Sequence, residues 1–306
     1  MNTGFTADTR IPLGTSGLGV APLGWGMWRF AGAERAVARA RVDAALEAGC
    51  TLFDTADIYG LGGSTGFGGA ETLLGEVLRE DPALRARMVI ATKAGITPPV
   101  PYNSTTAYLV AACEASLRRL GIEQIDLFQI HRPDLLAHPG EVAAAFDRLH
   151  AAGKIRAAGV SNYSAAQIES LCTHMPFKLA TVQPEFSPLA IEPLTDGVLE
   201  VALGRGIAVL AWSPLGQGRL GNVSASATDA RSRAVVAALE AIAARAGVDR
   251  AAVAYAWIMA HPTRAIPLIG TQNPARIREA ARAYRVELTR EEWYQILVAS
   301  RGEPMP

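Results

Sequence analysis

The amino-acid sequence predicts an α/β protein folded as a (β/α)8 barrel, also called a TIM barrel. Three observations lead to this prediction. Short apolar runs alternate with amphipathic helical stretches along the chain. The apolar runs are nearly continuous, as is typical of strands buried on both faces of a parallel sheet. Eight such runs are found, and eight βα units in roughly 250 residues are the content of a closed barrel.

The predicted elements follow in order along the chain. The eight strands are the apolar runs at 21–26, 51–57, 88–94, 125–131, 155–161, 180–186, 207–213 and 265–269. Helices, with apolar residues three and four positions apart, are expected at 34–48, 70–80, 106–120, 139–152, 164–173, 192–205, 231–246 and 249–260. Additional C-terminal helices are expected after the last strand.

The N-terminal segment 10–20, RIPLGTSGLGV, has turn glycines between apolar residues and predicts a β-hairpin. We expect this hairpin to cap the N-terminal end of the barrel. A doubly wound nucleotide-binding sheet is the alternative fold, but LGWGMW lacks the GxGxxG spacing that it requires. The glycines of 60–71 are too irregular for a phosphate-binding turn and indicate a loop beside a pocket. Without a linker or internal repeat, residues 1–306 are predicted to form a single domain.

Composition and charge exclude several classes of protein. Half of the 306 residues are apolar, and 29 basic residues balance 29 acidic ones. Scattered basic residues argue against binding to nucleic acid or to a membrane surface. No apolar run reaches the roughly 20 residues of a membrane span, and no secretory signal is visible at the N-terminus. Because Cys50, Cys113 and Cys172 lack metal-ligand spacing, we expect a reduced, cytoplasmic protein with no metal site.

Four polar residues lie at or just after the ends of three consecutive predicted strands: Asp54, Tyr59, Lys93 and His131. The active site of such a barrel lies at the C-terminal ends of its strands. Neighbouring strands are about 4.8 Å apart, so the four side chains can converge on one pocket. Since Lys and Asp are rarely buried unless paired, Asp54 and Lys93 are expected to meet.

These residue types together can move a proton. A free tyrosine has a pKa of about 10, which is high for proton exchange at neutral pH. A nearby ammonium lowers this pKa, and a carboxylate holds the ammonium in place. We therefore expect Tyr59 to donate a proton and Lys93 to tune it. Asp54 would hold Lys93, and His131 would orient a substrate oxygen. Taken singly, each residue could instead be structural, as a packed loop residue, a turn cap or a core histidine.

Longer motifs further along the chain carry a resemblance to a known family. The segment FDRLHAAGKIRAAGVSNY (146–163) resembles the central signature of the aldo-keto reductase superfamily. QPEFSPL (183–189), AWSPLGQGRL (211–220) and IPLIGTQNPARIREA (266–280) follow in the family's order. The four polar residues are similar in spacing to the family's catalytic tetrad. The C-terminal ending is most similar to a bacterial subgroup of poorly defined substrate range.

The resemblance implies an oxidoreductase that passes hydride from NADPH to the carbonyl group of an aldehyde or ketone, with a proton from Tyr59. NADP(H) is expected rather than NAD(H). However, Gly270 stands where many relatives have a Lys that contacts the 2′-phosphate. The guanidinium of Arg276 can bind that phosphate bidentately instead. Aromatic and glycine-rich walls suit an apolar substrate, but no single compound and no oligomeric state is predicted.

The resemblance also implies a cofactor site across the barrel mouth. Its expected contacts are Gly26, Met27, Ser161, Asn162, Gln183, Trp212, Ser213, Pro214, Leu215, Gly216, Gly218, Gly270, Thr271, Gln272, Arg276 and Glu279. Among them, Ser161, Asn162 and Gln183 would bind the nicotinamide carboxamide, and Trp212 would stack on the ring, where many relatives have Tyr. The segment 213–218 would lie along the pyrophosphate and the segment 270–279 along the adenosine.

Trp28 and Tyr102 are expected to line the substrate pocket, bordered by Pro133 and the loops 60–69 and 214–231. Structural alternatives exist for the cofactor residues. Ser161 and Asn162 could cap the next helix, Trp212 could fill the barrel, and Arg276 could be a solvated charge.

Two other functions remain possible at this point. A cofactor-binding redox sensor or regulatory subunit could use the same barrel with little turnover. A Schiff-base aldolase could use Lys93 as its nucleophile.

Overall fold

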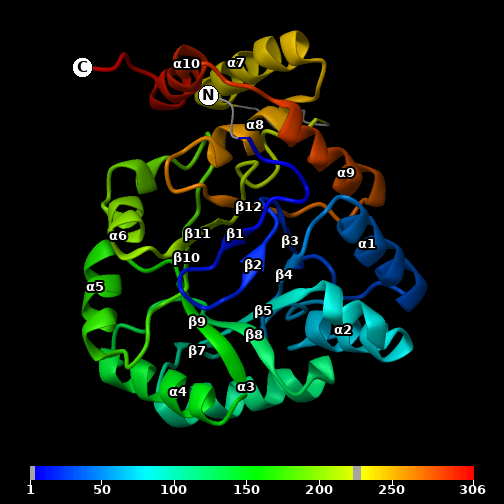
Figure 1. Ribbon diagram of the computed structural model, residues 1–306, viewed down its shortest axis with the longest axis vertical. Helices are drawn as coiled ribbons and strands as arrows, with labels where there is room; N and C mark the ends of the chain where they lie inside the picture. Colours follow the sequence, from blue (N-terminus) through cyan, green and yellow to red (C-terminus); the bar gives the residue numbers. More distant parts are fainter. Residues whose placement is uncertain (1–3, 223–228) are drawn as a thin grey trace.

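The computed structural model describes residues 4–222 and 229–306 and contains the predicted barrel. Eight strands form a closed ring: β3 (Gly24–Gly26), β4 (Leu52–Asp54), β5 (Val89–Ala94), β8 (Ile125–Ile130), β9 (Ile155–Ser161), β10 (Thr181–Gln183), β11 (Ala208–Ala211) and β12 (Ile266–Ile269). All neighbouring strands are parallel, and the ring closes where β12 pairs with β3. The prediction of a (β/α)8 barrel is confirmed (Figure 1).

Apart from β9, which matches its predicted run 155–161, the strands are shorter than the apolar runs that predicted them. After Asp54 the chain leaves the regular ladder, although it still follows β5. The backbone amides of Thr55 and Asp57 donate to the carbonyls of Ala91 and Lys93. This extension carries the chain toward Tyr59 at the C-terminal end of the barrel.

Helices surround the ring. They are α1 (Arg35–Glu47), α2 (Gly69–Glu80), α3 (Thr106–Leu120), α4 (Pro139–Ala151), α5 (Ala165–His174), α6 (Val198–Arg205), α7 (Ala230–Ala246) and α8 (Arg250–Met259). Short 3-10 helices occur at η1 (Pro82–Arg87), η2 (Glu192–Leu194) and η3 (Ala280–Arg285). The prediction of one helix over 192–205 is wrong, because Gly197 adopts a left-handed conformation (φ 86°) that separates η2 from α6.

Two additional helices follow the barrel, α9 (Pro274–Glu279) and α10 (Arg290–Arg301). Helix α10 lies beside α7 at one edge of the molecule (Figure 1). Trp293 of α10 stacks on Trp257 of α8 with ring centroids 4.9 Å apart. Each indole N–H donates to the other residue's carbonyl at 3.0 Å. None of the described helices is both long and apolar enough to cross a bilayer.

The predicted N-terminal hairpin is present as β1 (Ile11–Pro12) and β2 (Gly19–Val20), which pair antiparallel. Gly14 in its turn has a φ of 57° and packs on backbone atoms of Ala180 and Gly206, the residues just before β10 and β11. The hairpin therefore covers the N-terminal end of the barrel (Figure 1). A second hairpin, β6 (Ile96–Thr97) and β7 (Val100–Tyr102), follows β5 at the opposite end and is not predicted by the sequence.

Candidate active site

The centre of the candidate site is an ion pair inside the C-terminal end of the barrel. Lys93 Nζ lies 2.6 Å from Asp54 Oδ2 and donates a second hydrogen bond to the Thr55 carbonyl at 2.8 Å. Asp54 is 2 % exposed and Lys93 1 % exposed. Two charges can be buried together here because each satisfies the other.

The second carboxylate oxygen of Asp54 is held by two amide groups. Gln183 Nε2 donates to Asp54 Oδ1 at 3.0 Å and Gln129 Nε2 at 3.3 Å. Gln129 is absent from the residues that the sequence suggests. The sequence does contain a signal for Gln129. It stands two positions before His131, and alternate residues of a strand lie on the same side.

Tyr59 and His131 complete this group. Lys93 Nζ lies 5.1 Å from the centroid of the Tyr59 ring. The rings of Tyr59 and His131 meet edge to face with centroids 5.7 Å apart. The structure thus brings together all four polar side chains, from β4, the loop after β4, β5 and the residue after β8.

Burial and neighbouring charges set the protonation of these groups. Burial raises the pKa of Tyr59, and the Lys93 ammonium offsets only part of that rise. Burial alone would lower the pKa of Lys93, but Asp54 and Tyr59 raise it above its ordinary value. Burial, helped by Lys93 and Arg132, holds the pKa of His131 well below its ordinary value. At neutral pH the site therefore contains a neutral phenol, an ammonium and a neutral imidazole.

A chain of hydrogen bonds connects the ion pair to the expected nicotinamide site. Ser161 Oγ donates to the Gln183 carbonyl at 2.8 Å and accepts from Asn162 Nδ2 at 2.9 Å. Asn162 Nδ2 also donates to the His131 carbonyl at 3.0 Å. Trp212 Nε1 donates to Asn162 Oδ1 at 2.9 Å. These residues form one rigid wall beside Asp54.

The helix-capping alternative for Ser161 and Asn162 does not hold. Helix α5 is capped by Ser164 and Gln167, which form a complete capping box, so Ser161 and Asn162 are not its caps. Asn162 instead has a left-handed backbone (φ 60°), a strained conformation typical of functional sites. Trp212 is half-buried and packs against the hydrophobic core, and the Arg132 guanidinium lies 5.6 Å from its ring centroid.

The expected pyrophosphate segment has a left-handed backbone at three positions. Ser213 has a φ of 49° and Gly216 a φ of 54°. Gly218 is exposed, has a φ of 95°, and has open space where a Cβ would stand. A Cβ at Gly216 would lie 2.8 Å from Leu189 Cδ1. Contact of this segment with a cofactor stays a prediction.

The expected adenosine segment carries two features that suit a ligand. Gln272 Oε1 is buried and has no hydrogen-bond partner within the described chain, whereas its Nε2 donates to the Gly26 carbonyl. Arg276 is exposed, and no ion pair to its side chain is found among the described residues. Arg278 and Arg282, by contrast, pair with Glu47 and Asp249. The solvated-charge alternative fits those two arginines better than Arg276.

Met27 is fully buried, as are Ser161 and Gln183, and its contact with a cofactor stays a prediction. Trp28 is 65 % exposed on the loop after β3, and Tyr102 is 36 % exposed at the end of β7. Part of the expected loop 214–231, namely 223–228, lies outside the described residues.

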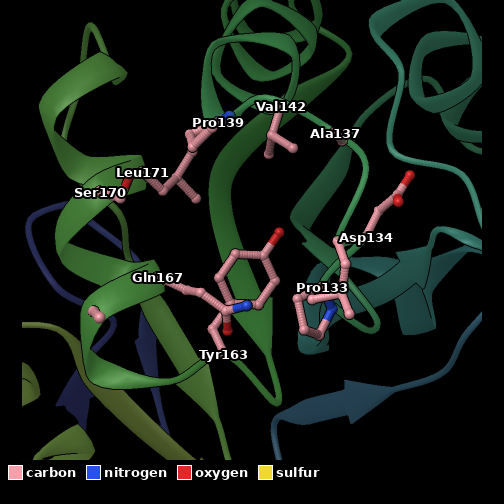
Figure 2. Close-up of a pocket in the computed structure, with 11 residues that line it drawn as sticks. Pro133, Asp134, Ala137, Pro139, Val142, Tyr163, Gln167, Ser170 and Leu171 are labelled. Atoms are coloured by element: carbon pink, nitrogen blue, oxygen red, sulfur yellow. The ribbon is translucent and has the colours of Figure 1, made fainter.

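A cavity of about 270 Å³ lies between α4, α5 and the loop after β8. Figure 2 shows the Tyr163 ring among the labelled side chains that line it. Pro133, expected beside the substrate, lines this cavity, whereas none of the four polar residues does. It is therefore separate from the ion pair.

The site can now be compared with known proteins. The family model described as the Aldo/keto reductase family matches residues 22–299. A 6-dehydroglucose reductase of Novosphingobium aromaticivorans is 53 % identical over 96 % of this chain and 96 % of that protein. The chain belongs to the aldo/keto reductase family. It is therefore an oxidoreductase that acts on carbonyl groups.

A second relative in sequence and one solved structure are also similar to this chain. A 6-dehydroglucose reductase of Agrobacterium fabrum is 38 % identical, over 91 % of this chain and 94 % of that protein. The crystal structure of a thermostable aldo-keto reductase in complex with the inhibitor epalrestat superposes with a TM-score of 0.81. It is 24 % identical and covers 95 % of this chain and 99 % of its own, which supports the same barrel fold.

Proposed function

We propose that the protein reduces an aldehyde with hydride from NADPH, and that Tyr59 supplies the proton to the carbonyl oxygen. The observation that carries this proposal is the buried Asp54–Lys93 pair, whose ammonium lies 5.1 Å from the Tyr59 ring centroid. A buried cation beside a phenol stabilises the phenolate that remains after proton transfer.

Each residue then has a physical role. The neutral phenol of Tyr59 holds the proton until the carbonyl oxygen gains negative charge. Lys93 stabilises the resulting phenolate, and Asp54 keeps Lys93 charged and in place. His131, held neutral by burial, can hydrogen-bond the substrate oxygen without a competing charge. When bound, the reduced nicotinamide would supply the hydride.

The wall of Ser161, Asn162 and Trp212 would hold the nicotinamide ring and orient the face that meets the substrate. The half-buried indole of Trp212 offers the flat surface that stacking needs. The Arg132 guanidinium that now covers this surface would move aside when the ring binds. The uncovered Gly218 and the unpartnered Gln272 Oε1 are consistent with a ligand extending along the mouth.

The Schiff-base alternative is disfavoured by the surroundings of Lys93. Its ammonium donates to Asp54 and to the Thr55 carbonyl, and its pKa is raised above the ordinary value. A Schiff-base lysine must lose its proton to attack a carbonyl. Here Asp54 and Tyr59 raise the pKa of Lys93, so Lys93 loses its proton less readily than an ordinary lysine.

A sugar-derived aldehyde is the substrate class that we propose. Two relatives bear the name 6-dehydroglucose reductase. Arg132 follows His131, and its charge acts on both Tyr59 and His131. No carboxylate pairs with Arg132 in the part of the chain that the structure describes. A guanidinium with free donors beside the reacting groups suits a substrate rich in hydroxyl oxygens better than a wholly apolar one.

The test is NADPH oxidation by the purified protein with a panel of aldehydes that includes 6-dehydroglucose and an apolar aldehyde of similar size. Tyr59→Phe should lower kcat by about a thousandfold, because a positioned proton donor contributes roughly 10²–10⁴-fold, while NADPH binding is retained. Near-full activity in Tyr59→Phe would reject this proton donor. Binding of NADPH without oxidation in a single turnover, by any aldehyde, would favour the sensor alternative.

A further inference from the structure

The barrel core contains two polar residues to which the proposed reaction assigns no role. Gln129 of β8 and Thr181 of β10 are both fully buried. The interior of such barrels is usually filled by branched apolar side chains. Burying an amide and a hydroxyl is unfavourable unless both are hydrogen-bonded, so their presence calls for a specific partner.

Gln129 bonds the carboxylate of Asp54, and Thr181 bonds Gln129. Gln129 Nε2 donates to Asp54 Oδ1 at 3.3 Å, on the oxygen that does not bind Lys93. Thr181 Oγ1 donates to Gln129 Oε1 at 3.2 Å. Gln183 Nε2 also donates to Gln129 Oε1, at 3.5 Å. The orientation of the Gln129 amide is therefore set by Thr181, and its N–H group faces Asp54.

A glycine makes this arrangement possible. Gly159 of β9 stands in register between Gln129 on one side and Thr181 on the other. A Cβ on Gly159 would lie 2.0 Å from Thr181 Oγ1 and 3.0 Å from Gln129 Cγ. Any larger residue would break the contact across β9. Three neighbouring strands thus combine to aim one amide at Asp54.

We propose that Gln129, held by Thr181 across Gly159, is a positioning residue that fixes the Asp54 carboxylate and thereby sets the strength of the Asp54–Lys93–Tyr59 proton relay. The inference rests on the proposed reductase function. It adds residues that do not touch the reacting atoms and act through Asp54 alone.

The physical effect follows from charge. Two amide donors on Oδ1 spread the negative charge of Asp54 and keep the carboxylate from rotating away from Lys93. The charged or titratable groups that face Tyr59 are Lys93, Asp54, His131 and Arg132, and the charge of Asp54 acts to raise the pKa of Tyr59. Loss of the Gln129 donor leaves the negative charge of Asp54 less neutralised. The pKa of Tyr59 should then rise, making Tyr59 a weaker acid.

The experiment replaces Gln129 with Met, which has a similar unbranched shape and no N–H donor. We expect Gln129→Met to lower kcat near neutral pH by about tenfold, because the phenol becomes a poorer proton donor. The alkaline limb of the kcat–pH profile should move to higher pH, with the KM for NADPH within about twofold of wild type. Thr181→Val should act in the same direction but more weakly.

Thr92→Val is the matched control. Thr92 is equally buried on β5, next to Lys93, but its hydroxyl donates to Glu71 and not to Asp54. Its removal costs one buried hydrogen bond without altering the relay. We expect an unchanged pH profile, even if thermal stability falls.

A second measurement does not depend on turnover. Ultraviolet titration of phenolate, with the signal of a Tyr59→Phe background subtracted, reports the pKa of Tyr59 directly. An upward shift in Gln129→Met or Thr181→Val supports the inference, and a pKa equal to wild type in both variants overturns it. If wild type reduces no carbonyl compound, the proposed function fails, while this titration still decides the role of Gln129. If Gln129→Met does not fold, the Thr181→Val result decides.

Discussion

Arg276 is the side chain on which the preference for NADPH should depend. It is exposed on α9, and the neighbouring arginines 278 and 282 already have carboxylate partners. A free guanidinium matches a phosphate dianion with two parallel hydrogen bonds. Since Gly270 offers no side chain, Arg276 is the cation of this segment most suited to the 2′-phosphate.

We predict that Arg276→Ala raises the KM for NADPH by about tenfold or more, the effect of losing charge-assisted hydrogen bonds. The KM for NADH should change little, because NADH lacks the 2′-phosphate. Steady-state kinetics with both cofactors would measure this difference. Arg278→Ala is the control, since that arginine pairs with Glu47, and it should leave both constants near wild type. Equal effects of Arg276→Ala on the two cofactors would remove Arg276 from phosphate recognition.

A second residue, Asp57, has an unusual protonation state. It is 1 % exposed, and neither carboxyl oxygen has a hydrogen-bond partner within the described residues. Burial, and then the nearby Glu71 carboxylate, raise the pKa of Asp57 to about 8. Glu71 itself is satisfied by Thr92 and Arg119. Asp57 is therefore a neutral acid at neutral pH.

This protonation links stability to pH. The folded protein holds the Asp57 proton up to about pH 8, whereas an unfolded aspartate releases it near pH 4. Between these values the folded state binds more protons, so the free energy of unfolding falls as pH rises through this interval.

We predict that Asp57→Asn, which keeps the shape without the titration, weakens this decline. Relative to wild type, the free energy of unfolding of the variant should rise by about 3–4 kcal/mol between about pH 5 and about pH 8. Urea unfolding at the two pH values would show it. The same pH slope in both proteins would mean that Asp57 is ionised in the folded state.

At the scale of elements, the N-terminal hairpin depends on a close backbone contact. A Cβ on Gly14 would lie 3.0 Å from Ala180 Cα, at the start of β10. Gly17, in the same hairpin, has a similar positive φ of 75° but nothing within 4 Å of a Cβ. Both glycines have a positive φ that would strain an alanine, but only Gly14 is closely packed.

We predict that Gly14→Ala lowers the free energy of unfolding by about 1–3 kcal/mol more than Gly17→Ala, because only the former inserts a methyl group into a filled contact. Denaturant unfolding of the two variants isolates this difference. Both should keep the wild-type KM for NADPH, since the hairpin lies at the end of the barrel opposite Tyr59. Equal losses would show that backbone strain alone accounts for both glycines.

Elements also show where sequence reasoning succeeds and fails. Long apolar runs identify each barrel strand, because burial on both faces leaves a clear pattern. The hairpin β6–β7 escapes notice, since strands of two and three residues are too short to show a period. The split before α6 comes from Gly197, whose left-handed backbone interrupts an otherwise continuous helical pattern.

For the site, strand ends suffice to suggest Asp54, Lys93 and His131, whose polar character stands out in apolar runs. Gln129 is different. Its role depends on facing Gly159 and Thr181 in register, and register across three strands is a property of the assembled barrel.

On the scale of the whole molecule, the barrel joins its first strand to its last. Every barrel strand has two neighbours, so no backbone edge of the ring remains open. Helix α10 then fixes the closing segment through the stacked pair of Trp257 and Trp293. The active site at the C-terminal end draws on strands from most of this ring, which places its groups on a rigid frame.

The pairing of β3 with β12 also has a consequence for how the protein is made. Because the two strands are separated by most of the chain, the ring cannot close until nearly all of it has left the ribosome. During synthesis, one edge of β3 faces no partner, and an open apolar edge can pair with another nascent chain. We therefore expect this edge of β3 to stay unpaired until the final strand emerges.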